Sequence, residues 1–214
     1  MSERVFVNKL HDLTDQSIKA GKYVWLRKVY KRKNLSTKEF QQVWADWWKG
    51  MVPPRLEVDL ILASEDPIEV IDKTLVGCVE LEYFSSKDIG RKNFCEGLQQ
   101  AMAFAVFGFD GLSLWHIFSR NVGDQIIENY GKTVEELIKG FKLPIFYLAT
   151  KILNEEKLVL KCYKPWKLDE QSVDYFIDSL IGYWMERGNR NPLLEDNKIR
   201  DRRKVVKTIL KIPI

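Results

Sequence analysis

Two apolar segments that carry acidic residues decide the fold of this chain: RLEVDLIL, residues 55–62, and LVGCVELEY, residues 75–83. Their content of Val, Leu and Ile is typical of buried strands. Because side chains alternate between the two faces of a strand, Asp59 lies opposite the apolar face of the first segment. Glu80 and Glu82 share one face of the second, about 6.6 Å apart along it. Pairing of the two strands would bring the three carboxylates together.

A buried carboxylate cluster needs a compensating charge, because like charges repel and lose their hydration on burial. Magnesium prefers one or two carboxylates together with water molecules and a phosphate oxygen. Such a metal orients a phosphodiester, polarises its phosphoryl group and lowers the pKa of an attacking water. The alternative is an edge hairpin whose acidic face lies in solvent, and the pattern alone does not distinguish the two.

The neighbouring patterns predict an α/β protein with a central mixed β-sheet flanked by α-helices. Before the acidic strands we expect a helix over 3–20, a strand over 22–30, and a helix from Ser36 or Thr37 through Trp48. After them we expect a helix over 88–109, a strand over 111–118, a helix over 122–141, strands over 144–150 and 157–163, and a helix over 170–187. The polar stretch 186–198 predicts a hinge. The domain is therefore expected to span 1–190, followed by a basic C-terminal extension over 191–214.

Length and composition restrict the class of protein. The 214 residues, 45% of them hydrophobic, fit one domain. No apolar run approaches the roughly 18 residues needed to span a bilayer, and the N-terminus lacks the layout of a signal peptide. We therefore expect a soluble cytoplasmic protein with no membrane partner. The three cysteines form no CxxC pair, so neither a zinc site nor a disulfide framework is predicted.

Basic residues are concentrated in two segments. Residues 19–33 hold seven Lys or Arg and no acidic residue, and residues 198–211 hold seven with Asp201 alone against them. This distribution predicts a polyanionic partner such as DNA, the alternative being two solvated faces. The residues expected to contact the phosphate backbone are Lys28, Lys31, Arg32, Lys33, Arg202, Arg203 and Lys204.

The two acidic strands resemble the motif of the PD-(D/E)XK nuclease superfamily, in which a strand bearing Asp precedes a strand ending in Glu-x-Lys. VDLIL with Asp59 is similar to the first half, and VGCVELEY with Glu80-Leu81-Glu82 to the second. The resemblance implies a restriction-endonuclease-like fold that binds Mg²⁺ or Mn²⁺. It also implies that Asp59, Glu80 and the backbone carbonyl of Leu81 are metal ligands.

Two further features extend the resemblance. Gln100 and Phe104 are similar to the Q-x-x-x-Y signature of RecB-like nucleases, which implies that Gln100 orients the site or the attacking water. Glu3, followed by Gly21 and KYVW, resembles the first helix and strand of archaeal Holliday-junction resolvases, in which the helix Glu helps to hold the metal. The latter resemblance implies a homodimer acting on branched DNA. The whole chain is also similar to nuclease-like proteins of archaeal spindle-shaped viruses, whose compartment is the host cytoplasm.

The chain departs from the motif at its lysine, which is replaced by Glu82. An acidic residue at this place occurs in a few restriction enzymes of the superfamily, as a metal ligand or a base. Alternatively Lys87 or Lys92 reaches into the site, or the site is inactive. Val58 also stands where the motif has Pro.

The remaining chemistry-bearing residues favour no other class of enzyme. His116 is interpreted as a structural histidine within an apolar strand, and no glycine-rich phosphate loop or nucleophile elbow is present. The cluster WADWWKG, residues 44–50, is interpreted as core or dimer interface, with base stacking as the alternative.

Three hypotheses follow. The first is a Mg²⁺-dependent deoxyribonuclease of DNA replication, repair or recombination with Asp59, Glu80, Glu82 and Gln100 as catalytic residues and Glu3 completing the metal site. The second is a nuclease fold that binds DNA without cutting it. The third is a regulatory protein that works through protein contacts and binds no DNA.

Overall fold

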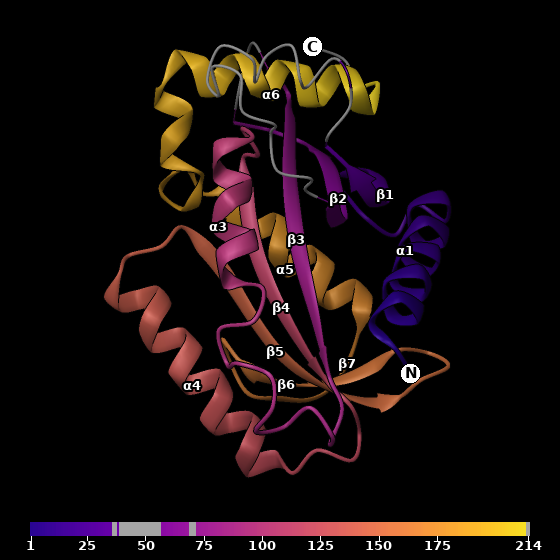
Figure 1. Ribbon diagram of the computed structural model, residues 1–214. Coiled ribbons are helices and arrows are strands. Elements are labelled where there is room, and N and C mark those ends of the chain that lie inside the picture. Colours follow the sequence, from indigo (N-terminus) through magenta and orange to yellow (C-terminus); the bar gives the residue numbers. More distant parts are fainter. Residues whose placement is uncertain (36–37, 39–56, 69–71, 213–214) are drawn as a thin grey trace.

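The computed structural model describes residues 1–35, 38, 57–68 and 72–212. These residues form a seven-stranded sheet whose strands follow one another in chain order (Figure 1). The strands are β1 (Leu26–Asn34), β2 (Glu57–Glu65), β3 (Thr74–Phe84), β4 (Gly111–Phe118), β5 (Ile145–Asn154), β6 (Val159–Lys164) and β7 (Leu168–Ser172). β3, β4 and β5 run parallel, whereas all other neighbours are antiparallel, so the sheet is mixed.

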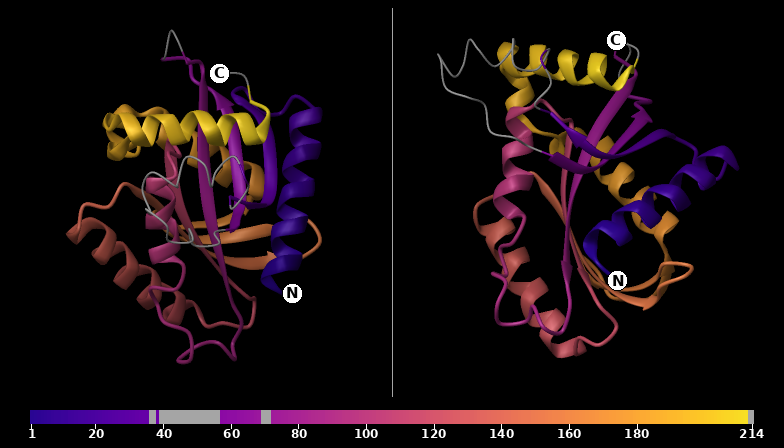
Figure 2. Two further views of the ribbon diagram at one scale, coloured as in Figure 1. Left: turned by 45° about the horizontal axis from the view of Figure 1, so that its top comes forward. Right: turned by 45° about the vertical axis from the view of Figure 1, so that its right-hand side comes forward.

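Helices cover both faces of this sheet (Figure 2). α3 (Leu98–Val106) and α4 (Asp124–Gly140) connect the parallel strands and share one core with α6 (Asn197–Leu210). α1 (Glu3–Lys19) and α5 (Val173–Met185) build the core of the opposite face. The prediction of an α/β protein with a central mixed sheet flanked by helices is therefore confirmed.

Two glycines allow α5 to approach the parallel strands closely. Gly77 of β3 pairs with Gly111 of β4, and a Cβ atom on either residue would lie 2.2 Å from the ring of Trp184. Trp184 is fully buried between α5 and the sheet. Because only glycine leaves room for the indole, this pair sets the distance between the helix and the sheet.

The C-terminal segment belongs to the core, which corrects the prediction of a basic extension after a hinge. Residues 186–198 form two 3₁₀ turns, η1 (Arg187–Asn189) and η2 (Pro192–Glu195), and α6 then packs Val206 and Leu210 into the core. Arg203 donates to Asp110 at 2.7 Å. Asp72 accepts hydrogen bonds from Arg203 and Lys207. Basic side chains of α6 thus bind acidic residues that precede β3 and β4. The run of charges in the sequence therefore belongs to an amphipathic helix and not to an extension.

Other differences concern the ends of elements. The helix expected over 88–109 begins only at Leu98, because the chain turns repeatedly between 85 and 97 and adopts positive φ at Gly90 and Gly97. β7 was not predicted, since LDEQS lacks an apolar face. The helix expected after Ser36 or Thr37, including the WADWWKG cluster, lies outside the described residues. Within the described part of the chain, no helix has the length and apolarity to cross a bilayer.

Candidate metal and phosphodiester site

The predicted carboxylates lie at a fork between two strands. The ladder between β2 and β3 ends at the pair Leu60–Val79. Beyond this pair β2 remains bonded to β1, and β3 remains bonded to β4, so the two strands separate. Asp59 and Glu80 are the next residues on each strand, and their side chains point to the same face, because directly opposite residues do so in antiparallel pairs. The structure thus brings them together, as the sequence predicted.

Glu80 is buried, Asp59 is half-buried, and the hydrogen-bonding capacity of the pair is not fully satisfied. Glu80 is only 4% exposed, and its Oε2 atom has no hydrogen-bond partner among the described residues. Asp59 accepts a hydrogen bond from the backbone N–H of Leu81 at 3.1 Å through Oδ2. A buried carboxylate oxygen without a donor is costly, so the site favours either a proton or a cation at Glu80.

The pKa values of the three carboxylates are raised, first by burial. Burial together with the neighbouring Asp59 and Glu82 raises the pKa of Glu80 to about 10. Burial raises the pKa of Asp59 to about 6, against the lowering effect of the Leu81 hydrogen bond. Burial raises the pKa of Glu82 to about 7, although Lys92 opposes the shift. The cluster therefore holds protons at pH 7 that a divalent cation would displace.

Lys92 is the lysine that the structure brings to this site. Its Nζ lies 3.3 Å from Oε2 of Glu82 and donates to the backbone carbonyl of Tyr83 at 3.3 Å. Lys87 is exposed in the turn after β3 and lies in a different pocket. Between the two lysines that the sequence left open, the geometry favours Lys92 as the replacement for the missing motif lysine.

The backbone at Gly97 packs over the side chains of Glu80 and Glu82. Gly97 is the N-cap residue of α3 and has φ of +75°, which favours glycine. A Cβ atom there would lie 2.8 Å from Cγ of Glu82 and 3.2 Å from Cγ of Glu80. The backbone at the start of α3 therefore contacts the two glutamates closely, and the absence of a side chain leaves them space.

His116 anchors the backbone segment at Glu96 and Gly97, a role that the sequence did not reveal. It pairs with Glu82 in the β3–β4 ladder and is fully buried. Its Nε2 lies 3.0 Å from the carbonyl oxygen of Glu96, so Nε2 carries the hydrogen, and Nδ1 accepts from the hydroxyl of Tyr147 at 3.0 Å. Burial lowers the pKa of His116 to about 4, so the ring is neutral. The structural interpretation of His116 agrees with this bonding.

Glu3 and Gln100 approach the same place from two helices. Glu3, at the start of α1, raises the pKa of Asp59, Glu80 and Glu82 through its negative charge. Gln100 on α3 donates to the backbone carbonyl of Glu57 at 3.0 Å, which ties α3 to β2 beside Asp59. Both residues are therefore near the carboxylates. Glu3 adds a further negative charge, and Gln100 fixes α3 to β2 where β2 and β3 separate.

The predicted DNA-contacting residues divide into two groups. Lys28, Arg32 and Lys33 on β1 are exposed, and Arg32 lies near enough to lower the pKa of Asp59. Lys31 donates to Asp12 at 3.1 Å on the same surface.

The C-terminal group differs from its prediction. Arg202 is fully buried and donates to the backbone carbonyl of Val106 at 2.7 Å. Arg203 is bound by Asp110 and Asp72, and only Lys204 is exposed. Arg202 and Arg203 thus stabilise the fold and are not placed to contact phosphate, because the run of charges hid which side of α6 is buried.

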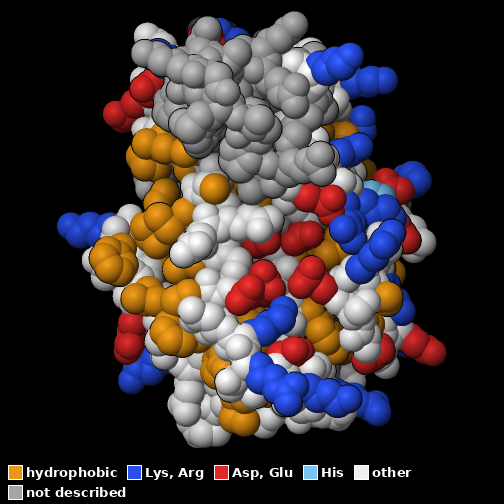
Figure 3. Space-filling view, viewed as in Figure 1, with side chains coloured by type: hydrophobic (Ala, Val, Ile, Leu, Met, Phe, Trp, Pro, Cys, Tyr) orange, Lys and Arg blue, Asp and Glu red, His pale blue; other side chains and the backbone are white. Residues whose placement is uncertain are grey.

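Acidic side chains gather near the centre of the face that carries α3, with Lys and Arg side chains beside and below them (Figure 3). Among residues 1–35, 57–68 and 72–212, no three His, Cys, Asp or Glu side chains form a ready-made metal cluster. The donor set nevertheless fits Mg²⁺, since one or two carboxylates and a buried unpartnered oxygen suffice for an ion that keeps several waters.

Comparisons with protein-family models, with curated proteins and with solved structures each gave no match to this chain.

Proposed function

We propose that this chain is a metal-dependent DNA endonuclease of the PD-(D/E)XK type with a restriction-endonuclease-like fold. The observation that carries the proposal is the buried, unpartnered carboxylate oxygen of Glu80 beside Asp59 at the fork of β2 and β3. Burying two carboxylates without compensation is unfavourable, and a divalent cation removes that penalty. Asp59 and Glu80 would hold Mg²⁺ or Mn²⁺, with the carbonyl of Leu81 and Glu3 as further ligands.

When bound, the metal would polarise the phosphoryl group and lower the pKa of a coordinated water. The chain's own residues supply the proton transfer and the charge stabilisation. Glu82, with its pKa raised to about 7 by burial, is suited to accept a proton at neutral pH. Lys92, 3.3 Å from Glu82, is suited to stabilise the negative charge that develops on the phosphate. Lys28, Arg32 and Lys33 on β1 would contact the DNA backbone.

Cleavage of labelled linear, single-stranded and four-way-junction DNA with Mg²⁺ or Mn²⁺ tests the proposal. We expect cutting by the wild type and its loss in Asp59→Ala and Glu80→Ala. Glu195→Ala, an exposed glutamate in η2, is the matched control. Cutting that both site variants retain would refute the assignment. Homodimer formation, which branched-DNA incision needs, is tested by light scattering of the purified protein.

A second candidate is a DNA-binding protein that does not cut. It is favoured by Glu82, which stands where the motif has its lysine. This protein would bind DNA with salt-sensitive affinity in both the wild type and the Asp59→Ala variant, and adding Mn²⁺ would neither start cleavage nor change the stability.

A further inference from the structure

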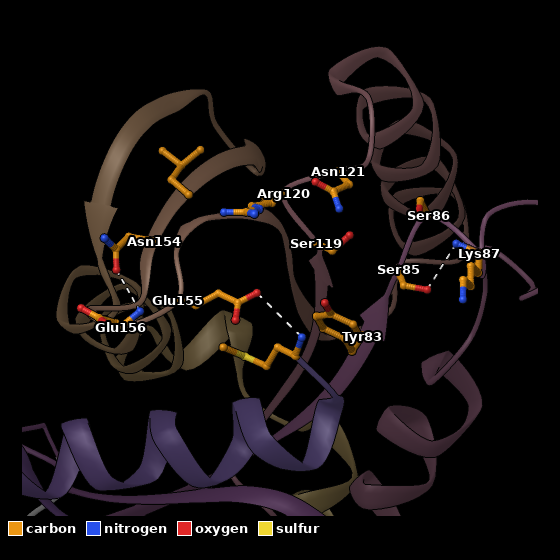
Figure 4. Close-up of a pocket in the computed structure, with 12 residues that line it drawn as sticks. Tyr83, Ser85, Ser86, Lys87, Ser119, Arg120, Asn121, Asn154, Glu155 and Glu156 are labelled. Atoms are coloured by element: carbon orange, nitrogen blue, oxygen red, sulfur yellow. Dashed lines mark hydrogen bonds and ion pairs between the residues drawn. The ribbon is translucent and has the colours of Figure 1, made fainter.

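A cavity lies at the carboxyl ends of the parallel strands β3 and β4 (Figure 4). Its volume is about 660 Å³, within the range of small-molecule sites. One wall is formed by the turn after β3, with Ser86 and Lys87, and by the loop after β4, with Arg120 and Asn121. Crevices at the carboxyl ends of parallel strands are the usual ligand sites of α/β sheets.

The opposite wall is the β5–β6 hairpin, which presents Glu156 and also Glu155, the latter ion-paired to the N-terminal ammonium group of Met1 at 3.8 Å. Figure 4 shows Arg120 between the two walls, reaching from its loop toward the hairpin. Neither Lys87 nor Arg120 forms an ion pair with a carboxylate among the described residues, whereas most lysines on the neighbouring surface do. The cavity therefore offers cations on one side and hydrogen-bond acceptors on the other.

A nucleotide matches this division of charge. Its phosphate is an anion for Lys87 and Arg120, and the amino or ring N–H groups of its base are donors for the two glutamates. A uniform polyanion such as a duplex backbone would meet the carboxylates of the hairpin and be repelled.

The cavity lies farther along the strand that carries Glu80 and Glu82, since Tyr83 and Ser85 line it. Ser85 follows Glu82 by three residues along β3 and its end, a distance of about 10 Å. Stacked nucleotides of one strand are about 3.4 Å apart, so the cavity lies roughly three nucleotides from a phosphate at the carboxylates.

We propose that this cavity binds one unpaired nucleotide of the DNA strand whose phosphodiester lies at Asp59 and Glu80. This inference rests on the proposed function and adds a substrate class to it, DNA with an unpaired nucleotide near the cleaved bond. Lys87 and Arg120 bind the phosphate, and Glu155 and Glu156 accept hydrogen bonds from the N–H groups of the exposed base.

The test is binding of a labelled oligothymidylate and of a fully paired duplex, in EDTA, by the wild type and by the double variant Lys87→Ala/Arg120→Ala. Both side chains are exposed, so the variant is expected to fold, which circular dichroism checks. The matched control is Lys157→Ala, an exposed lysine of the same hairpin that does not line the cavity.

We expect the double variant to bind the single strand at least tenfold more weakly, with little change on the duplex. The slope of log affinity against log salt should fall by about 0.7 for each lost phosphate contact. Unchanged single-strand affinity, or an equal loss on both DNAs, would overturn the proposal.

A cleavage arm with Mg²⁺ separates this inference from the proposed function. The ratio of the cleavage rate on gapped DNA to that on paired DNA is compared between the double variant and the wild type. An unchanged ratio would overturn the cavity's role and leave the nuclease assignment intact. A wild type that never cuts, combined with single-strand binding lost in the double variant, would refute the nuclease and support the cavity.

Discussion

Replacing Glu80 by Gln should stabilise the metal-free protein at neutral pH. The side chain is 4% exposed, and burial with the charges of Asp59 and Glu82 raises its pKa from 4.5 to about 10. At pH 7 the folded protein therefore holds this carboxyl protonated, whereas the unfolded chain ionises it. The difference favours the unfolded state, and a neutral amide of nearly the same shape removes it.

The magnitude follows from linkage between protonation and folding. A raised carboxyl pKa leaves stability intact below about pH 4.5 and lowers it as the pH rises toward the folded value. The free energy of unfolding falls by about 1.4 kcal/mol for each pH unit in this window, which reaches about 3 kcal/mol at pH 7. Glu80→Gln lacks this dependence, so the gap between variant and wild type should widen steadily with pH.

Urea unfolding in EDTA from pH 5 to pH 9 measures the difference in the free energy of unfolding between Glu80→Gln and the wild type. Glu195→Gln, at an exposed position, should follow the wild type throughout. A gap between Glu80→Gln and the wild type that stays constant with pH would show that Glu80 ionises normally, and the argument for a cation at the fork would lose its basis. Any fixed offset from the amide's own burial does not alter the slope.

Three further outcomes are expected. Lys92→Met should lower the rate of DNA cleavage at pH 7 by ten- to a hundredfold, with DNA affinity in EDTA changing less than threefold; single-turnover kinetics and anisotropy measure the two. Calorimetric titration with Mn²⁺ should give affinity that rises between pH 5 and pH 8, because Asp59 and Glu82, with pKa values raised to about 6 and about 7 by burial, release their protons in that range. Asp110→Asn should lower the free energy of unfolding by about 1.5–3 kcal/mol in urea, since Arg203 loses one of its two carboxylate partners and keeps Asp72.

The sequence was sufficient for the features that local patterns determine. The alternation of RLEVDLIL and LVGCVELEY placed Asp59, Glu80 and Glu82 correctly on one face, because the period of a strand is fixed by its backbone. The helix over 3–20 and the strand over 111–118 were predicted for the same reason.

The sequence was insufficient where a residue's role depends on a distant partner. Arg202 and Arg203 appear in a basic run, yet Val106 and Asp110, some ninety positions away, decide that they are buried. The fork itself depends on where β2 leaves β3 while remaining bonded to β1, which no local pattern encodes. The apolar face of α6 was hidden because its buried side also carries charged groups.

The helix expected over 88–109 begins only at Leu98, and the same turns of the chain that shorten it place Lys92 at the site. A continuous helix over 88–109 would have carried Lys92 away from β3 along a straight axis. Instead the chain turns at Gly90 and Gly97, both at positive φ, and folds back over the end of the strand. His116 fixes this return through the carbonyl of Glu96, and Lys92 then reaches Glu82. The turn that replaces the expected helix therefore supplies the cation that the motif lacks, so its glycines are as much a part of the proposed site as the carboxylates.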